Sequence, residues 1–224
     1  MITADSVSKI VPTATGELTI LNQVSLSVND GDSLAIIGPS GAGKSTLLGL
    51  LAGLDTPTSG SITLGDYCIT DMNEEQRAKA RSELVGFVFQ TFQLLPGLTA
   101  LENVSLPLEL TGRKRATEMA REYLSKVGLA ERLDHYPKQM SGGEQQRVAI
   151  ARAFACEPRV LFADEPTGNL DSKTGNQIAD LLFEMNKQQQ TTLILVTHEQ
   201  RLADRCDACV LIDSGQVADE KASS

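Results

Sequence analysis

Basic residues are scarce in this sequence. Its 20 lysines and arginines stand against 29 aspartates and glutamates, which gives a net charge of −9. Proteins that bind nucleic acid usually present a basic surface that neutralises phosphate charges, so we expect no nucleic-acid partner. The one dense basic run, Arg113-Lys114-Arg115, follows Gly112 and is typical of a solvated loop, with contact to anionic lipid as the alternative.

Long apolar runs are also missing. None reaches the roughly 20 residues that a membrane-spanning helix needs, so a second chain must cross the membrane if this protein works there. The start of the chain lacks the basic, apolar and small-residue pattern of a signal peptide. We therefore expect a reducing, cytosolic compartment.

Cysteines are few as well, with four in 224 residues. Cys206 and Cys209 form a C-x-x-C pair, but a structural zinc site needs two more ligands. Neither His135 nor His198 stands at a suitable spacing. We expect all four cysteines to be free thiols.

The apolar residues that are present indicate an α/β fold. Residues 18–28 and 61–67 resemble strands of an N-terminal antiparallel part. Continuous apolar runs, typical of strands buried on both faces, occupy residues 33–38, 85–90, 159–164 and 191–198. Helical periodicity appears over residues 45–52, 73–83, 116–127, 143–155, 173–188 and 200–206. Apolar strands separated by helices predict a mostly parallel core sheet.

The stretch between Thr91 and Met140 contains no strand of the buried type. It predicts a helical subdomain inserted into the core of a single domain. We place the nucleotide-binding core at residues 1–90 and 156–218, the helical subdomain at about 91–155, and a short tail at 219–224.

A glycine-rich segment follows the apolar run at 33–38. It reads GPSGAGKST and fits the pattern G-x-x-x-x-G-K-[ST], between a strand and a helix as that motif requires. Backbone N–H groups and the helix N-terminus would surround phosphate, Lys44 would reach the outer phosphates, and Ser45 would hold Mg²⁺. The predicted phosphate-binding residues are Gly38, Pro39, Ser40, Gly41, Ala42, Gly43, Lys44, Ser45 and Thr46.

Two carboxylates follow the apolar run at 159–164. Asp164 ends that predicted strand, where it could serve the magnesium ion, and Glu165 stands one residue later. A carboxylate there could polarise a water molecule aimed at the terminal phosphate. The alternative is a strand that ends in a solvated acidic turn.

A second glycine-rich helix start occurs at Ser141-Gly142-Gly143. Ser141 and Glu144 have the spacing of a capping box, but two glycines in a first helical turn lower its stability. Glycines are expected where a ligand or another backbone comes very close. Because lysine and the magnesium ligands occur only at the first site, we expect this segment of one copy to close over nucleotide bound by another. This predicts a head-to-tail dimer with two shared ATP sites.

These motifs, in this order, resemble those of an ABC transporter ATPase subunit over about residues 1–218, and SGGEQ is the most specific of them. The resemblance implies that Gln90 contacts Mg²⁺ or the attacking water. It also implies that Asp171 touches the opposite subunit and that His198 orients water and the γ-phosphate beside Glu165. The implied cofactors are ATP and Mg²⁺.

The segments GLDTPTSG, LLPGLTALENV and LFADEPTGNLD are similar to one branch of that family. This branch holds the ATPases of lipoprotein-release systems (LolD), macrolide-type exporters (MacB) and the FtsE group, and the YbbA subfamily resembles the chain most. The implied partner is a permease with few membrane helices and a large extracytoplasmic domain. The implied location is the cytoplasmic face of the bacterial inner membrane, as a peripheral protein.

The sequence departs from the family pattern at three positions. Val11 stands where an aromatic residue usually stacks on adenine, and no aromatic residue is near it. Val11 could instead make an aliphatic contact with the base, or base selectivity could be loose. Met140 replaces a common leucine and Glu144 a common glutamine, and both substitutions keep a similar volume or capping role.

The apolar loop after Gln90 has two interpretations. Its side chains could form a groove for a coupling helix of the permease, or they could pack the helical subdomain onto the core. The residues concerned are Phe92, Leu94, Leu95, Pro96 and Leu98. Two other functions stay open: an ABC-type ATPase that acts on DNA or ribosomes, and a regulatory module that binds ATP but scarcely hydrolyses it.

Overall fold

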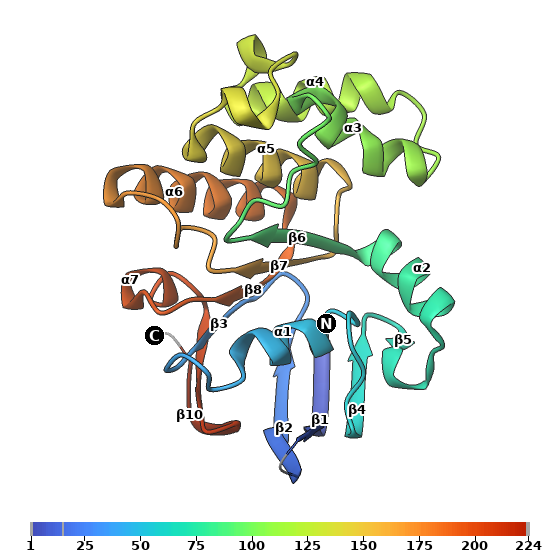
Figure 1. Ribbon diagram of the computed structural model, residues 1–224, viewed down its shortest axis with the longest axis vertical. Helices are drawn as coiled ribbons and strands as arrows, with labels where there is room; N and C mark the ends of the chain where they lie inside the picture. Colours follow the sequence, from blue (N-terminus) through green and yellow to red (C-terminus); the bar gives the residue numbers. More distant parts are fainter. Residues whose placement is uncertain (1, 15, 223–224) are drawn as a thin grey trace. The chain divides into compact units, whose positions relative to one another are not determined.

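Two long paired strands begin the part of the chain that the structure describes. The structure is a computed structural model and describes residues 2–14 and 16–222. β1 (Ile2–Thr13) pairs antiparallel with β2 (Gly16–Val28) on one side and β4 (Ser59–Leu64) on the other. β5 (Tyr67–Cys68) completes a sheet of order β2-β1-β4-β5, of which β1, β2 and β4 lie side by side in Figure 1. The predicted N-terminal antiparallel part is confirmed.

The chain forms two compact units, one running through Val85 and resuming at Thr191, the other spanning Gly86–Gln190. In the first unit, β3 (Ser33–Ile37) pairs parallel with β8 (Thr192–Val196) and β9 (Ala208–Asp213). β10 (Gln216–Ala222) pairs antiparallel with β9. The residues of β3 and β8 are almost all buried, as their unbroken apolar sequences predict.

The first unit also contains helices, and α1 and α7 contact its strands. α1 begins at Lys44, within the phosphate-binding segment, and packs its buried leucines against β2, β4 and β8. Because its apolar residues fix α1 on the sheets, the loop before it is held at the end of β3. The helical elements are α1 (Lys44–Leu51), a 3-10 turn at Ile69–Asp71, α2 (Glu74–Leu84) and α7 (Gln200–Ala203).

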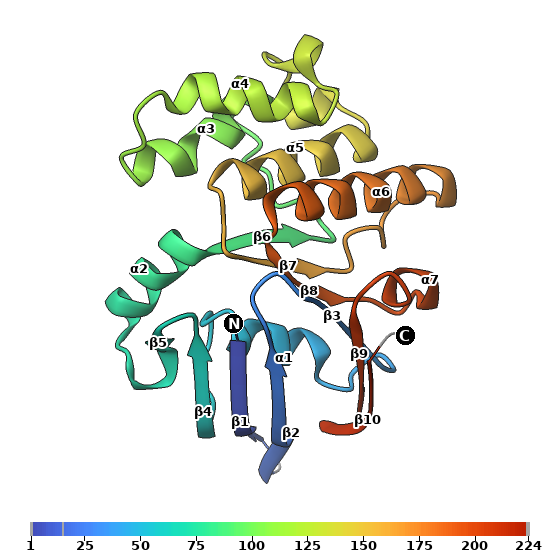
Figure 2. The same ribbon diagram turned by 180° about the vertical axis from the view of Figure 1, so that it is seen from behind.

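The second unit is mainly helical. Figure 2 shows α3, α4 and α5 grouped together, and each of these three helices contacts the other two. Two strands, β6 and β7, are neighbours in this unit. The elements are β6 (Val85–Phe89), α3 (Ala100–Leu110), α4 (Ala116–Lys126), α5 (Gly142–Ala155), β7 (Val160–Asp164) and α6 (Ser172–Gln189), with 3-10 turns at Ala130–Arg132 and Pro137–Gln139.

Three helices begin with the same device. Asn73, Thr99 and Ser141 each accept a hydrogen bond from the backbone N–H three residues later, and the side chain at that third position bonds back to the backbone of the capping residue. Such capping boxes satisfy N–H groups that a helix start leaves unpaired. They fix where α2, α3 and α5 begin.

The structure contains elements that the sequence pattern did not single out. One of them is α3, which carries Pro107 in its interior. The apolar periodicity alone did not mark this segment as a helix. β9 and β10 were also missed, and β10 takes in the start of the predicted tail. The predicted helical subdomain lies within the second unit, which also includes β7 and α6.

Candidate functional site

The phosphate-binding segment runs from the end of β3 to the first turn of α1, all in the first unit. Gly38 has φ +148°, and a Cβ there would collide with the backbone oxygen of Ile212 on β9. Gly43 has φ +98°, and a Cβ there would lie 2.8 Å from Cδ2 of Leu21 and 2.9 Å from the carbonyl oxygen of Ile20 on β2. The two glycines therefore let the loop fit between β2 and β9.

The middle of the loop is hydrogen-bonded to the turn between β9 and β10. Ala42 is buried, and its carbonyl accepts a hydrogen bond of 3.2 Å from the N–H of Gly215. Pro39, Ser40 and Gly41 are exposed on the other side. The loop thus has one face anchored to the unit and one face open to a ligand.

Lys44 is bent back over this loop. Its Nζ donates to the carbonyl oxygens of Gly38 and Pro39, at 2.9 Å each. Lys44 is half-buried, and both acceptors of its ammonium group are neutral backbone atoms. A positive charge held this way can bind an anion that enters the loop, because charge-assisted bonds to phosphate are stronger than those to carbonyls.

The start of α1 is suited to an anion. Gly43 occupies the capping position and has no side chain to fill it, and the first turn carries no acidic residue. Its N–H groups and the positive end of the helix dipole therefore face the loop. Ser45 is exposed and Thr46 is partly exposed in that first turn.

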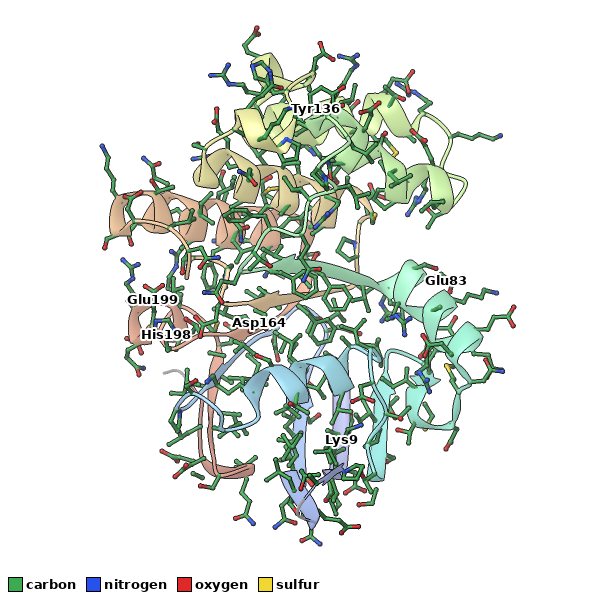
Figure 3. The ribbon with its side chains drawn as sticks, in the orientation of Figure 1. Lys9, Glu83, Tyr136, Asp164, His198 and Glu199 are labelled. Carbon is green, nitrogen blue, oxygen red and sulfur yellow. The ribbon has the colours of Figure 1, made fainter. Side chains whose placement is uncertain are left out.

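His198 and Val11 are the other predicted residues of the first unit. His198 is exposed two residues after β8 and lies beside Glu199 at the start of α7, as Figure 3 shows. Val11 is partly exposed on β1 and pairs in register with Leu18 on β2, which is 54% exposed. Directly opposed residues share a face of the sheet, so these aliphatic side chains are neighbours.

The two predicted carboxylates are in the second unit. Asp164 is the last residue of β7, after four buried residues, and Figure 3 places it at the end of that strand. Glu165 follows with φ +47°, in the left-handed region that residues other than glycine avoid. Its carbonyl accepts a hydrogen bond of 3.0 Å from the N–H of Gly168. Strained backbone of this kind is concentrated at functional sites.

Gln90 immediately follows β6 and is joined to the loop after Glu165. Its Nε2 donates to Oδ1 of Asn169 at 3.1 Å, and Nδ2 of Asn169 donates to the Gln90 carbonyl at 3.0 Å. Gly168 leaves room for this pair, since a Cβ there would lie 2.8 Å from Nε2 of Gln90. Sequence reasoning missed Asn169, because an amide inside a loop has no periodicity that marks it.

The second glycine-rich helix start is the beginning of α5. Ser141 accepts from the N–H of Glu144 at 3.3 Å, and Oε2 of Glu144 accepts from the N–H and hydroxyl of Ser141 at 2.8 and 2.9 Å. The backbone N–H of Ser141, its hydroxyl and Arg132 together hold the pKa of Glu144 below its usual range. This helix start is therefore capped by its own side chains.

The glycines of α5 also have neighbours within the chain. A Cβ on Gly142 would lie 3.3 Å from Cδ2 of Leu170, and one on Gly143 would lie 2.6 Å from Cγ2 of Thr174. Close packing of α5 against the start of α6 and the residues before it therefore gives one reason why Gly142 and Gly143 stand in the first turn of α5.

Asp171 caps α6. Its side chain accepts from the N–H groups of Lys173 and Thr174, at 3.1 Å each. Hydrogen bonds from Thr174 hold the pKa of the exposed Asp171 carboxyl below its usual range. A structural role at this position thus exists independently of any role across a subunit boundary.

The predicted residues are divided between the units. Val11, the phosphate-binding segment and His198 belong to the first, and the other predicted residues belong to the second. The described residues contain no cluster of three or more histidine, cysteine or acidic side chains arranged for a metal, and their four cysteines are free. Within the same residues we find no helix with the length and apolarity to cross a membrane.

Comparison with known proteins gives matches over most of the chain. A model of the ABC transporter family matches residues 21–168. The uncharacterized ABC transporter ATP-binding protein YbbA of Escherichia coli K12 is 55% identical over 206 residues, which are 91% of this chain and 90% of that protein. The lipoprotein-releasing system ATP-binding protein LolD of Legionella pneumophila Paris is 49% identical over 219 residues, 97% and 96% of the two chains.

A solved structure has the same fold. The dimeric post-hydrolysis state of the ATP-binding cassette MJ0796, bound to ADP and Pi, superposes with a TM-score of 0.92 at 38% identity, covering 100% of this chain and 99% of that chain. These matches confirm the family resemblance, the ATPase assignment and the fold class, including the mostly parallel core sheet.

Proposed function

Because the chain belongs to the ABC transporter family of ATP-binding proteins, we propose that it is the ATP-hydrolysing motor of a transporter or mechanotransmission complex. The observation that carries this proposal is the phosphate-binding segment, where Lys44 lies over an uncapped helix start. The alternative is an ABC-type ATPase, soluble or regulatory, that is not coupled to transport.

The chain offers a donor set that suits Mg²⁺. Magnesium prefers oxygen ligands and usually keeps several waters beside one or two protein groups and the substrate phosphates. The hydroxyl of Ser45 and the carboxylate of Asp164 would supply the protein ligands. Gln90 would add its side-chain oxygen, since its Nε2 is engaged by Asn169. Bound magnesium would neutralise charge on the outer phosphates.

Hydrolysis needs a group that accepts a proton from water. Water attacks the γ-phosphorus, the bond to the oxygen that bridges the β- and γ-phosphates breaks, and ADP and phosphate leave. Glu165 would accept the proton as the new P–O bond forms. Gln90 and His198 would orient the water and the γ-phosphate, and Lys44 would stabilise the charge on the phosphate oxygens.

The reaction site would be shared between two copies. Only one of the two glycine-rich helix starts combines a lysine with an uncapped first turn, so the chain binds one nucleotide. Ser141, Gly142 and Gly143 of a second copy would close over its γ-phosphate, and Asp171 would meet the opposite subunit. MJ0796 has been solved as a dimer, which supports the pairing of two copies.

The adenine base would rest on aliphatic side chains. No aromatic residue precedes Tyr67 in the sequence, while Val11 and Leu18 form a partly exposed pair on β1 and β2. β2 also contacts the phosphate-binding loop at Gly43. Apolar contact without ring stacking would bind the base weakly and discriminate little between purines.

The partner would be a membrane permease, bound at the cytoplasmic face of the bacterial inner membrane. Leu95 is 46% exposed and Pro96 is also exposed, which supports a docking surface in the loop after Gln90. The chain is similar to LolD, the ATP-binding protein of a lipoprotein-releasing system, and we propose that its permease has few membrane helices and a large extracytoplasmic domain. The acidic net charge argues against a nucleic-acid partner.

Glu165→Gln tests the proposed function. Glutamine keeps the size and the left-handed backbone of the native residue but cannot accept the proton, so ATP hydrolysis should fall by at least about 100-fold. ATP binding and ATP-dependent dimers should remain. Equal, negligible phosphate release by the native chain and the variant would instead favour the regulatory module. Affinity purification from membranes would identify the permease.

A further inference from the structure

The loop that follows Gln90 contains two consecutive strained residues. Phe92 has φ +60° and Gln93 has φ +48°, both in the left-handed region. Each such residue other than glycine costs roughly 1 to 2 kcal/mol in backbone energy. Two in succession persist only where surrounding contacts hold them in place.

Arg152 of α5 supplies two of those contacts. Its Nη1 donates to the carbonyl oxygen of Gln93 at 2.7 Å, and its Nη2 donates to the carbonyl oxygen of Phe92 at 3.0 Å. The planar guanidinium group thus forms hydrogen bonds with both strained residues at once. Burial removes water from the Arg152 guanidinium, which lowers its pKa, and the two carbonyls replace part of the lost hydration.

The same helix contacts the chain on the other side of Gln90. Gln146 is fully buried, and its Nε2 donates to the carbonyl oxygen of Pro166 at 2.7 Å and lies 3.4 Å from that of Phe89. At the start of α5, a Cβ on Gly142 would lie 3.6 Å from the ring of Phe92. α5 therefore touches the residues before and after Gln90, and also the residue that follows Glu165.

We propose that Arg152 is a positioning residue that holds the Phe92–Gln93 turn and thereby couples movement of α5 to the position of Gln90. This inference rests on the role of Gln90 in the proposed function. In the shared site proposed above, Ser141–Gly143 at the N-terminal end of α5 would contact the nucleotide held by the partner copy. Because the guanidinium fork ties this helix to the strained turn, a shift of α5 moves the segment that carries Gln90.

Arg152→Lys tests the coupling. Lysine keeps the charge and most of the length, but it lacks the planar guanidinium group that donates hydrogen bonds to two carbonyls. Amide hydrogen exchange at residues 91–95 should become faster, and kcat for ATP should fall roughly tenfold with KM little changed, because Gln90 is misplaced by a small distance. Arg152→Gln serves if the lysine variant does not fold.

Arg147→Lys is the matched control. Arg147 lies on the same helix and donates one hydrogen bond, to the carbonyl oxygen of Val127 at 3.1 Å, away from the strained turn. This control should leave both exchange at residues 91–95 and kcat close to native.

A double-mutant cycle shows whether Arg152 acts through Gln90. In a Gln90→Ala background, Arg152→Lys should lower kcat by less than twofold further, because the residue it positions is already absent. A full tenfold loss in that background, or unchanged exchange at residues 91–95, would overturn the coupling alone. A fully active Gln90→Ala would instead contradict the role of Gln90 in the proposed function, and the coupling would fall with it.

Discussion

The two glycine-rich helix starts of this chain differ in what fills their first turn. At α1, Gly43 leaves the capping position without a side chain, and Lys44 lies over the loop. At α5, Ser141 and Glu144 cap each other, and a carboxylate already stands in the first turn. Glycine content alone therefore does not make a phosphate site. The start of α1 can bind an anion by itself, whereas the start of α5 can only add contacts to an anion held elsewhere.

The strongest test of this difference removes the positive charge of Lys44 at the start of α1. Lys44→Ala should lower ATP hydrolysis by at least about 100-fold, because the outer phosphates lose their ammonium contact. Mg-ATP binding, measured by calorimetry, should weaken in parallel. Lys79→Ala is the control, since Lys79 is an exposed lysine on α2 whose side chain is 77% accessible. An unchanged ATPase rate in Lys44→Ala would refute the phosphate site.

Blocking the glycine-rich start of α5 should prevent assembly without weakening nucleotide binding. Ser141→Arg should leave ATP binding by the monomer intact while abolishing ATP-dependent dimers, measured in the Glu165→Gln background by light scattering. The variant also loses a helix cap, which costs about 1 kcal/mol.

Thr99→Arg is the control for that lost cap. Thr99 and Glu102 form an equivalent capping box at the start of α3. This control should be destabilised to a similar extent, yet it should dimerise normally. Dimers in Ser141→Arg would exclude the shared site.

A third variant separates packing from ligand approach at α5. Gly143→Ala places a Cβ 2.6 Å from Cγ2 of Thr174, and overpacking of this kind costs about 1 to 3 kcal/mol. Thr174→Ser removes that methyl group and should restore the melting temperature of the double variant.

Dimer formation by the double variant decides between two reasons for the glycine. We expect ATP-dependent dimerisation to stay weaker than in Thr174→Ser alone, by roughly tenfold in affinity, because the added methyl group obstructs the partner's nucleotide. Full recovery of dimerisation would mean that Gly143 serves only the contact with α6.

The smallest expected effect concerns pH. The pKa of Glu144 is lowered in the folded chain, so its carboxylate stabilises the fold above the ordinary value of 4.5, and this contribution is lost as pH falls through the lowered pKa. Glu144→Gln should lower the free energy of unfolding by about 0.5 kcal/mol at pH 7. Chemical denaturation should show this difference shrinking below pH 4.5.

Glu131→Gln is the control for the pH measurement. Glu131 is exposed in the 3-10 turn at 130–132. A stability difference for Glu144→Gln that persists unchanged at low pH would show that the carboxylate charge does not stabilise the cap of α5.

Much of this fold could be predicted because its signals are local. The unbroken apolar sequence of β3 marks a buried strand, and the spacing of Ser141 and Glu144 marks the start of α5. α3 was missed because Pro107 interrupts the expected helical pattern, although contacts with α4 and α5 hold the helix. Tertiary packing, which no local pattern records, decided that element.

The candidate site divides in the same way. Lys44 and Glu165 stand in motifs that the sequence displays directly. The partnership of Asn169 with Gln90 joins residues 79 positions apart, and the contact of Gly143 with Thr174 joins two helices. Such pairings depend on how the chain folds back on itself, so they could only be found in three dimensions.

The most direct test of the shared site is the rate of ATP hydrolysis per protomer as a function of protein concentration. Two copies that complete each other's sites should give a rate per protomer that rises with concentration and levels off once dimers predominate. A full rate that stays constant down to concentrations at which light scattering detects only monomers would contradict the account.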